Sequence, residues 1–137
     1  MAPGQEQQGT AVCVSKWVLG GHYLQQEYTS KLGDQPFTVL QFLGYDAVKK
    51  RFFEIKMDNM DTAVLHTEGT LSADGRTITR TGERSDPGSG KAGPIRTVTT
   101  LVDADHFTLE WFLPGPDGKE ARAVLLSHAR RKPATKP

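Results

Sequence analysis

The sequence predicts an all-β fold, an antiparallel up-and-down barrel of about nine strands. Apolar residues recur at every second position rather than with the period of a helix, and turn-forming residues arrive every ten to fourteen residues. Most predicted connections are two to five residues long, which only antiparallel neighbours can use. A meander of short strands leaves unpaired edges. Closure into a barrel removes them, whereas a two-sheet sandwich, the alternative, needs long crossing connections that are scarce here.

The first half of the chain contains four predicted strands. Ala11–Leu19 and His22–Leu32 meet at the turn signal "LGG", and "GDQP" separates the second strand from Phe37–Tyr45. The connection "DAVKK" then leads into Arg51–Asp58, where apolar and charged residues alternate. These connections supply the glycine, proline and aspartate that turns need for a positive or preset φ.

The second half contains five more predicted strands, punctuated by "DNMD", "ADG", "DPGSGKAGP", "DAD" and "PGPDGK". In chain order they are Thr62–Ser72, Arg76–Arg84, Ile95–Val102, His106–Leu113 and Glu120–Arg130. The one long connection, "SDPGSGKAGP", is either a flexible lid or a plain hairpin loop. Its small, polar and rigid residues favour the plain loop.

Composition predicts one domain over residues 11–131, preceded by a flexible lead-in of residues 1–10 and followed by a disordered tail of residues 132–137. The 137 residues carry 17 basic and 16 acidic side chains, a balance that argues against binding nucleic acid or an anionic membrane. The single cysteine, Cys13, excludes an intrachain disulfide. With no basic-then-apolar leader and no run of roughly 18 apolar residues, we expect a cytoplasmic protein that does not enter a membrane.

The segment "RFFEIKMD" poses the question of which strand face looks inward. One face carries three apolar residues, Phe53, Ile55 and Met57, and the other carries the charged residues Glu54, Lys56 and Asp58. Burying each large apolar side chain is worth roughly 1.5–3 kcal/mol, whereas an unpaired buried charge is costly. The sequence therefore favours the apolar triplet inside and a solvated charged face.

The hairpin closed by "DADH" presents the same choice. Pairing Val102 with Phe107 groups Val98 with Leu109 and Trp111 on an apolar face. A shift of one residue exchanges the faces and would instead bring Arg96 diagonally opposite Glu110. Burial energy favours Leu109 and Trp111 inside the barrel.

Six stretches resemble a known family in order and spacing: "WVLGGHYLQQEY", "LGYDAVKKRF", "MDNMDT", "EGTLSADGRTITRTGE", "IRTVTTLVDADHFTLEWFLPGPDGKE" and "HARRK". They resemble the DUF1579 family of bacterial proteins from about Gly9 to Lys132. The resemblance implies a calycin-like fold, related in shape to lipocalins, and no established reaction. Longer members have an additional N-terminal strand. Either a nine-strand barrel closes without it, or an edge is left open and covered by a second copy, and we expect a homodimer.

The chain also departs from the pattern of that family. The family has a large aromatic residue at the position of Lys56, an acidic residue at Leu125, tyrosine at His128 and often arginine at His22. If these positions line the pocket, the pocket has been rebuilt in this chain. A ligand therefore does not transfer from relatives.

We expect the barrel to bind a small, largely apolar molecule, oriented by a few polar groups. The candidate ligand-binding residues are Tyr23, Tyr45, Met57, Arg96, Glu110 and Trp111. The alternative is a cofactor-independent enzyme, a hydrolase or proton-transfer catalyst, that uses polar residues lining the cavity. Its candidate catalytic residues are Glu54, Lys56 and His128.

No metal or cofactor is expected. The four histidines lack the close spacing of zinc ligands, and the sequence has no P-loop, dinucleotide fingerprint or nucleophile elbow. A third hypothesis is a structural dimeric module without a ligand.

Overall fold

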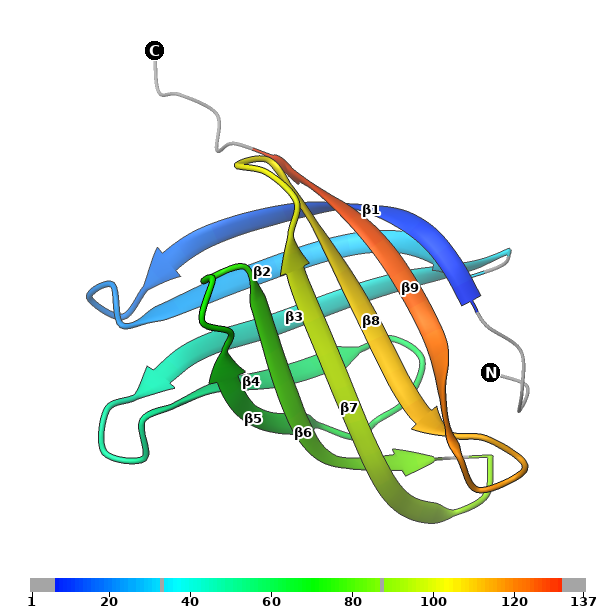
Figure 1. The fold of residues 1–137 in the computed structure, drawn as a ribbon. Helices are drawn as coiled ribbons and strands as arrows, with labels where there is room; N and C mark the ends of the chain where they lie inside the picture. The colour runs from blue at the N-terminus through cyan, green and yellow to red at the C-terminus, as the bar shows by residue number, and fades with distance from the viewer. Residues whose placement is uncertain (1–6, 33, 87, 132–137) are drawn as a thin grey trace.

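A computed structural model describes residues 7–32, 34–86 and 88–131 of the chain. These residues form nine strands and no helix, and the strands close into a barrel in sequence order (Figure 1). The strands are β1 (Gln7–Val18), β2 (Tyr23–Leu32), β3 (Gln35–Asp46), β4 (Arg51–Asp58), β5 (Leu65–Leu71), β6 (Thr77–Asp86), β7 (Lys91–Leu101), β8 (His106–Pro114) and β9 (Glu120–Arg131). The all-β class and the closed nine-strand barrel are as predicted.

The pair that closes the barrel corrects one part of the prediction. Consecutive strands are antiparallel, but β1 pairs with β9 in parallel, from Gln7 opposite Val124 to Val14 opposite Arg131. Each hairpin reverses the chain direction, so the first and last of an odd number of strands run the same way. The barrel is therefore mixed rather than antiparallel throughout. Its described strands leave no open sheet edge, which removes the ground on which a homodimer was expected.

The predicted N-terminal lead-in and the predicted long connection between the sixth and seventh strands are both shorter in the structure than expected. β1 begins at Gln7, inside the predicted lead-in of residues 1–10, and the predicted tail of residues 132–137 lies outside the described residues. The described residues of the predicted long connection, 85–86 and 88–94, form neither a lid nor a long loop. Ser85 pairs with Ala92 and Glu83 with Pro94, so the ladder of β6 and β7 continues through most of them.

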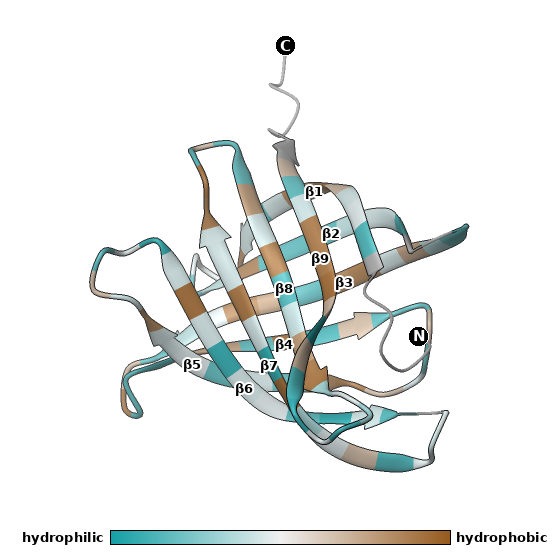
Figure 2. Ribbon diagram, turned by 45° about the vertical axis from the view of Figure 1, so that its right-hand side comes forward, coloured by the Kyte–Doolittle hydropathy of each residue, from teal (hydrophilic) through white to brown (hydrophobic). Residues whose placement is uncertain are grey.

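The barrel is flattened, with β1–β4 crossing β6–β9 steeply (Figure 1). Hydrophobic and hydrophilic segments alternate along the strands (Figure 2), as expected where one face of each strand looks inward. The apolar core within the described residues consists of Ala11, Cys13, Tyr28, Phe37, Val39, Ile95, Phe107, Leu109, Trp111, Val124 and Leu126. The prediction that Leu109 and Trp111 lie inside is confirmed.

The prediction for β4 is wrong, because its charged face looks inward. Glu54 and Lys56 are 2 % and 1 % exposed, whereas the apolar triplet Phe53, Ile55 and Met57 lies half-buried on the outside. The outer face gives these apolar residues partial cover. Ile55 lies opposite Phe42 and Met57 opposite Leu40 on β3, and the Phe53 ring contacts that of Tyr23. Burial of the charged face therefore does not leave the apolar face fully exposed to water.

The β7–β8 hairpin adopts the register that was not favoured. Leu101 pairs with Phe107, so Val98 faces outward opposite Glu110 and Thr97 is the inward residue. The turn fixes this register. Asp103 accepts a hydrogen bond from the Asp105 main-chain N–H (2.8 Å) and contacts the His106 ring.

Close approach of β5 and β6 requires a glycine. At Gly69, opposite Arg80, an added Cβ would overlap the main-chain carbonyl of Thr79. The absence of a side chain lets the barrel wall bend tightly there, and it leaves Arg80 pointing into the interior.

Candidate functional site

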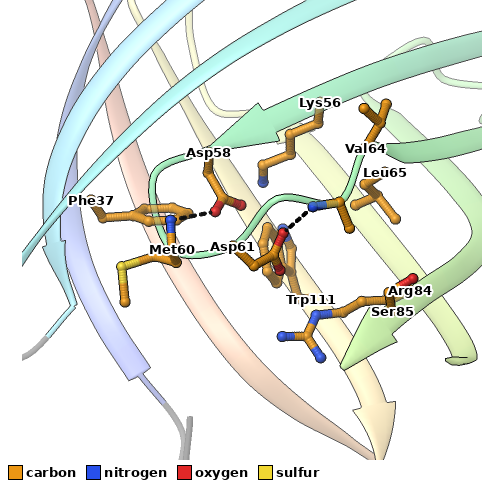
Figure 3. Close-up of a pocket in the computed structure, with 11 residues that line it drawn as sticks. Phe37, Lys56, Asp58, Met60, Asp61, Val64, Leu65, Arg84, Ser85 and Trp111 are labelled. Atoms are coloured by element: carbon orange, nitrogen blue, oxygen red, sulfur yellow. Dashed lines mark hydrogen bonds between the residues drawn. The ribbon is translucent and has the colours of Figure 1, made fainter. Parts of the chain in front are cut away.

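A cavity of about 80 Å³ lies at one end of the barrel, beneath the segment of residues 59–64 that joins β4 to β5 (Figure 3). Its lining combines aromatic and aliphatic side chains with four charged ones. The residues are Phe37, Lys56, Asp58, Met60, Asp61, Ala63, Val64, Leu65, Arg84, Ser85 and Trp111. The rim is accessible to solvent, because Met60 and Val64 are exposed.

Local hydrogen bonds hold the 59–64 segment over the cavity. Asn59 is bound to Thr38 of β3 twice: its N–H donates to the Thr38 carbonyl (3.2 Å), and its Oδ1 accepts from the Thr38 N–H (2.9 Å). Asp58 then accepts from the Met60 N–H and Asp61 from the Ala63 N–H. These aspartates shape the turn in the way that short acidic side chains do, and they also line the cavity.

Lys56 places a buried ammonium at the inner wall of this cavity. Its Nζ lies 3.7 Å from the centroid of the Trp111 ring and within 6 Å of the centroids of the Tyr28 and Phe37 rings, at 5.8 and 5.9 Å. It donates to no acceptor among the described residues. Burial, which disfavours the charged form, lowers the pKa of Lys56 to about 8, despite the opposing effect of Glu54.

Some other polar side chains of the interior are paired, although several buried atoms, including both ring nitrogens of His128, have no hydrogen-bond partner among the described residues. Arg80 Nη1 lies 3.1 Å from Glu54 Oε2, and both side chains are almost fully buried. Gln41 Nε2 donates to Gln26 Oε1 (2.7 Å), and Gln26 Nε2 donates to Ser15 Oγ (3.1 Å). Lys56 is thus a buried charge that the surrounding protein solvates only with aromatic faces.

His128 is buried in the barrel but does not line this cavity. Its ring stacks on Phe107 with centroids 4.4 Å apart and meets the edge of Tyr28 at 4.5 Å. Burial, together with the charge of Lys56, lowers the pKa of His128 to about 4, so its imidazole is neutral near pH 7. Burial also raises the pKa of Tyr28 well above its ordinary value.

Comparison with known proteins gives a family but no activity. Residues 1–130 match the family model DUF1579, described as a protein of unknown function. The chain belongs to the DUF1579 family. No curated protein and no solved structure matches it significantly. Among the described residues, no helix is long and apolar enough to cross a membrane.

The site predicted from sequence overlaps the cavity of this DUF1579 protein at two residues, Lys56 and Trp111. The other catalytic candidates, Glu54 and His128, are buried in the interior but do not line it. Four ligand-binding candidates lie elsewhere on the outer wall: Tyr23, Met57, Arg96 and Glu110.

The outward position of two of these candidates has a simple structural role. Arg96 pairs with Glu120 (2.6 Å), and Glu110 pairs with Arg122 (3.1 Å), as cross-strand ion pairs. Tyr45 is half-exposed at the opposite end of the barrel, against Phe52. None of the three reaches the cavity.

Sequence reasoning missed several cavity residues, chiefly Phe37, Asp61, Leu65 and Arg84. A signal for Arg84 was present in "TITRTGER", because it alternates with Ile78, Arg80 and Gly82 on one strand face. No local signal marks Asp61, whose position depends on how the 59–64 segment folds over the barrel end.

The charges of the cavity lining balance. Lys56 and Arg84 are cationic, and Asp58 and Asp61 are anionic, so the formal sum is zero. Among residues 7–32, 34–86 and 88–131, no three His, Cys, Asp or Glu side chains are grouped as a metal site. The cavity therefore offers a partly apolar wall, a buried ammonium without an acceptor at its base, and charged lining groups whose formal sum is zero.

Proposed function

We propose that this DUF1579 protein binds a small, largely apolar molecule with a neutral carbonyl group in the cavity beneath residues 59–64. The observation that carries the proposal is the Lys56 ammonium, which is buried, lines the cavity and has no acceptor among the described residues. A carbonyl oxygen on a bound molecule would accept from this donor. Such a charge-assisted hydrogen bond is worth roughly 1.5–3 kcal/mol.

The dimensions of the cavity limit the ligand. An apolar cavity of roughly 150 Å³ accommodates benzene, and this one measures about 80 Å³. A head group of about four or five heavy atoms fits inside, and a longer apolar tail would leave past the exposed rim residues Met60 and Val64. Phe37, Leu65 and Trp111 would pack against its apolar part.

The balanced lining favours a neutral ligand over an anion. A carboxylate at Lys56 would have to lose its hydration and lie close to Asp58 and Asp61, which line the same cavity. An amide, ketone or aldehyde presents the same acceptor at a smaller desolvation cost. Electrostatics thus supports a carbonyl compound.

Trp111 provides a direct test because it lies in the cavity wall. The chain has two tryptophans, and Trp17 is 69 % exposed, so Trp17→Phe leaves Trp111 as the only indole reporter at little structural cost. Titration of the Trp17→Phe protein with butyramide is expected to change Trp111 emission saturably, with a Kd on the order of 1 mM for so small a ligand. An n-butylammonium ion of similar size, which is repelled by Lys56, is expected to leave the emission unchanged.

Two variants locate the binding. Lys56→Met is expected to weaken butyramide binding at least tenfold through loss of the hydrogen bond, and Leu65→Phe is expected to weaken it by filling the cavity. Lys16→Met removes an exposed lysine on β1 and serves as the matched control. Equal affinities in all three variants would show that binding occurs elsewhere and would refute the proposal.

A second candidate function, cofactor-independent catalysis, is favoured by one observation. The lowered pKa of Lys56, about 8, gives the protein a buried amine that is partly neutral near physiological pH. Glu54 is engaged by Arg80, and His128 does not line the cavity, so a catalytic role rests on Lys56 rather than on the three residues together.

A further inference from the structure

We infer that Lys56 forms a reversible imine with a small aldehyde or ketone that enters the cavity. This inference rests on the proposed function, because it requires the same cavity and the same orientation of the ligand carbonyl toward Nζ. It goes further by assigning a covalent step and a narrower ligand class. Amides, which bind by hydrogen bonding alone, do not take part in it.

The geometry gives the Lys56 amine the properties of a nucleophile. Its side chain comes from the inward face of β4, and its Nζ points into the space beneath the 59–64 segment (Figure 3). No carboxylate among the described residues holds it in an ion pair within 4.0 Å, whereas Arg80 engages the neighbouring Glu54. A lysine desolvated in a largely apolar pocket is a recognised source of a reactive amine.

The surroundings also set the protonation of this amine. The charged and titratable groups around it are Glu54 and Asp58 on β4, Arg80 and Arg84 on β6, Tyr28 on β2, His128 on β9 and Asp61 in the 59–64 segment. Burial outweighs the nearby carboxylates and lowers the Lys56 pKa to about 8. At pH 7 roughly one molecule in ten then carries the neutral amine, against about one in 3,000 for an ordinary lysine.

The step conserves atoms and electrons without an oxidant or reductant. The nitrogen lone pair of neutral Lys56 attacks the carbonyl carbon, a C–N bond forms, and the carbonyl electron pair moves to oxygen, which takes up a proton. One N–H proton is lost from nitrogen, which leaves a neutral carbinolamine. Its hydroxyl takes up a second proton, the nitrogen lone pair forms the C=N bond as the C–O bond breaks and water leaves, and the nitrogen gives up its last proton to yield the imine. Asp58 and Asp61 line the cavity and are the carboxylates placed to exchange these protons.

The test uses the full chain and a defined carbonyl probe. The protein is incubated at pH 7 with butanal and sodium cyanoborohydride, which reduces an imine to a stable secondary amine, and butylation is measured by peptide mass mapping over time. Lys56 is expected to be modified at least tenfold faster than exposed Lys16, because its larger neutral fraction outweighs its lower basicity. The α-amino group of Met1, which has a low ordinary pKa, is mapped separately.

Variants provide an independent readout. In Lys56→Met, and in Lys56→Arg if that variant folds, the fast phase of butylation is expected to disappear while the rates at Lys16 and Met1 stay the same. Prior addition of butyramide is expected to slow modification of Lys56 alone. These outcomes would identify Lys56 as the reacting residue within the cavity.

The same samples separate failure of the imine from failure of the proposed function. Saturable binding of butyramide by Trp111 emission, with Lys56 modified no faster than Lys16, would overturn the imine and leave the binding function standing. The proposed carbonyl-binding cavity would be overturned by a different pair of results: fast modification of Lys56 that butyramide does not slow, together with no saturable binding of butyramide by Trp111 emission. Modification that simply follows solvent exposure along the chain would overturn the inference.

Discussion

Replacing Lys56 with methionine is expected to make the barrel more stable at pH 7. The substitution keeps the length of an unbranched side chain but removes a charge that has no acceptor among the described residues and is 1 % exposed. A buried, unpaired ammonium opposes folding because the unfolded chain hydrates it fully. Methionine fills irregular apolar space well and contacts aromatic rings favourably, and Trp111 lies directly beside this position.

The magnitude follows from the titration of Lys56 and from its aromatic neighbours. A pKa lowered from 10.5 to about 8 corresponds to roughly 3 kcal/mol of unfavourable free energy for the charged form. The attraction between Nζ and the Trp111 ring offsets about 1–2 kcal/mol of this. The net gain for Lys56→Met at pH 7 is therefore about 1–2 kcal/mol, or a rise in Tm of several degrees for a domain of this size.

The pH dependence has a definite sign. Because the pKa of Lys56 is depressed on folding, its stability contribution is fully present above pH 10.5 and is lost as the pH falls through about 8. The wild-type protein should therefore gain stability between pH 8 and pH 10, whereas Lys56→Met should lack this rise. The raised pKa of Tyr28 acts in the opposite direction above pH 10, so the comparison is made below that value.

Urea denaturation of wild type, Lys56→Met and the exposed-site control Lys16→Met, at pH 7 and pH 9.5, measures these differences. The control is expected to match wild type within about 0.5 kcal/mol. If Lys56→Met proves less stable than wild type by more than about 1 kcal/mol at pH 7, the ammonium is paired in solution, and the reasoning about both its pKa and its reactivity is wrong.

The remaining predictions concern other buried groups. His128, with its pKa lowered to about 4, should cost the protein roughly 3 kcal/mol of stability as the pH falls from 6.5 to 4. In His128→Phe, the free energy of unfolding measured with urea should fall less over the same pH range. Arg80→Met should destabilise the barrel by about 3–5 kcal/mol by leaving Glu54 charged and unpaired. The added change Glu54→Leu should recover most of this loss in a double-mutant cycle, and full additivity would argue against a direct pair. Gly69→Ala should lower the Tm strongly because its Cβ would overlap the backbone of β6, whereas Gly93→Ala, which meets nothing within 4 Å, should change it little; equal effects would contradict the close approach.

Some features of the site could be predicted strand by strand. Alternation and turn residues located all nine strands, and the apolar pattern of "HFTLEWFL" placed Trp111 inside, because no other orientation of that strand buries as much apolar surface. The odd strand count also implies a parallel closing pair, although the pairing of β1 with β9 is visible only when the ends of the chain are brought together. These are properties of one strand or of strand number.

The position of Lys56 could not be predicted in this way. The apolar residues of β4 favoured the opposite orientation. Weighing the burial energies of its two faces gave the wrong answer because only the residues of this one strand were counted. The outer face of β3 and β4 gives Phe53 and Ile55 partial cover, and Arg80, reached through two hairpins, neutralises Glu54. The free energy of an orientation depends on such partners, which are distant in sequence.

The amino-acid sequence by itself determined the number, order and period of the strands, since these depend on neighbouring residues and on turn chemistry. Only the tertiary structure decided which face of β4 looks inward. It also placed the 59–64 segment over a cavity that has Lys56 at its base. Strand orientation and side-chain solvation depend on contacts made across the barrel, between residues that the sequence holds far apart.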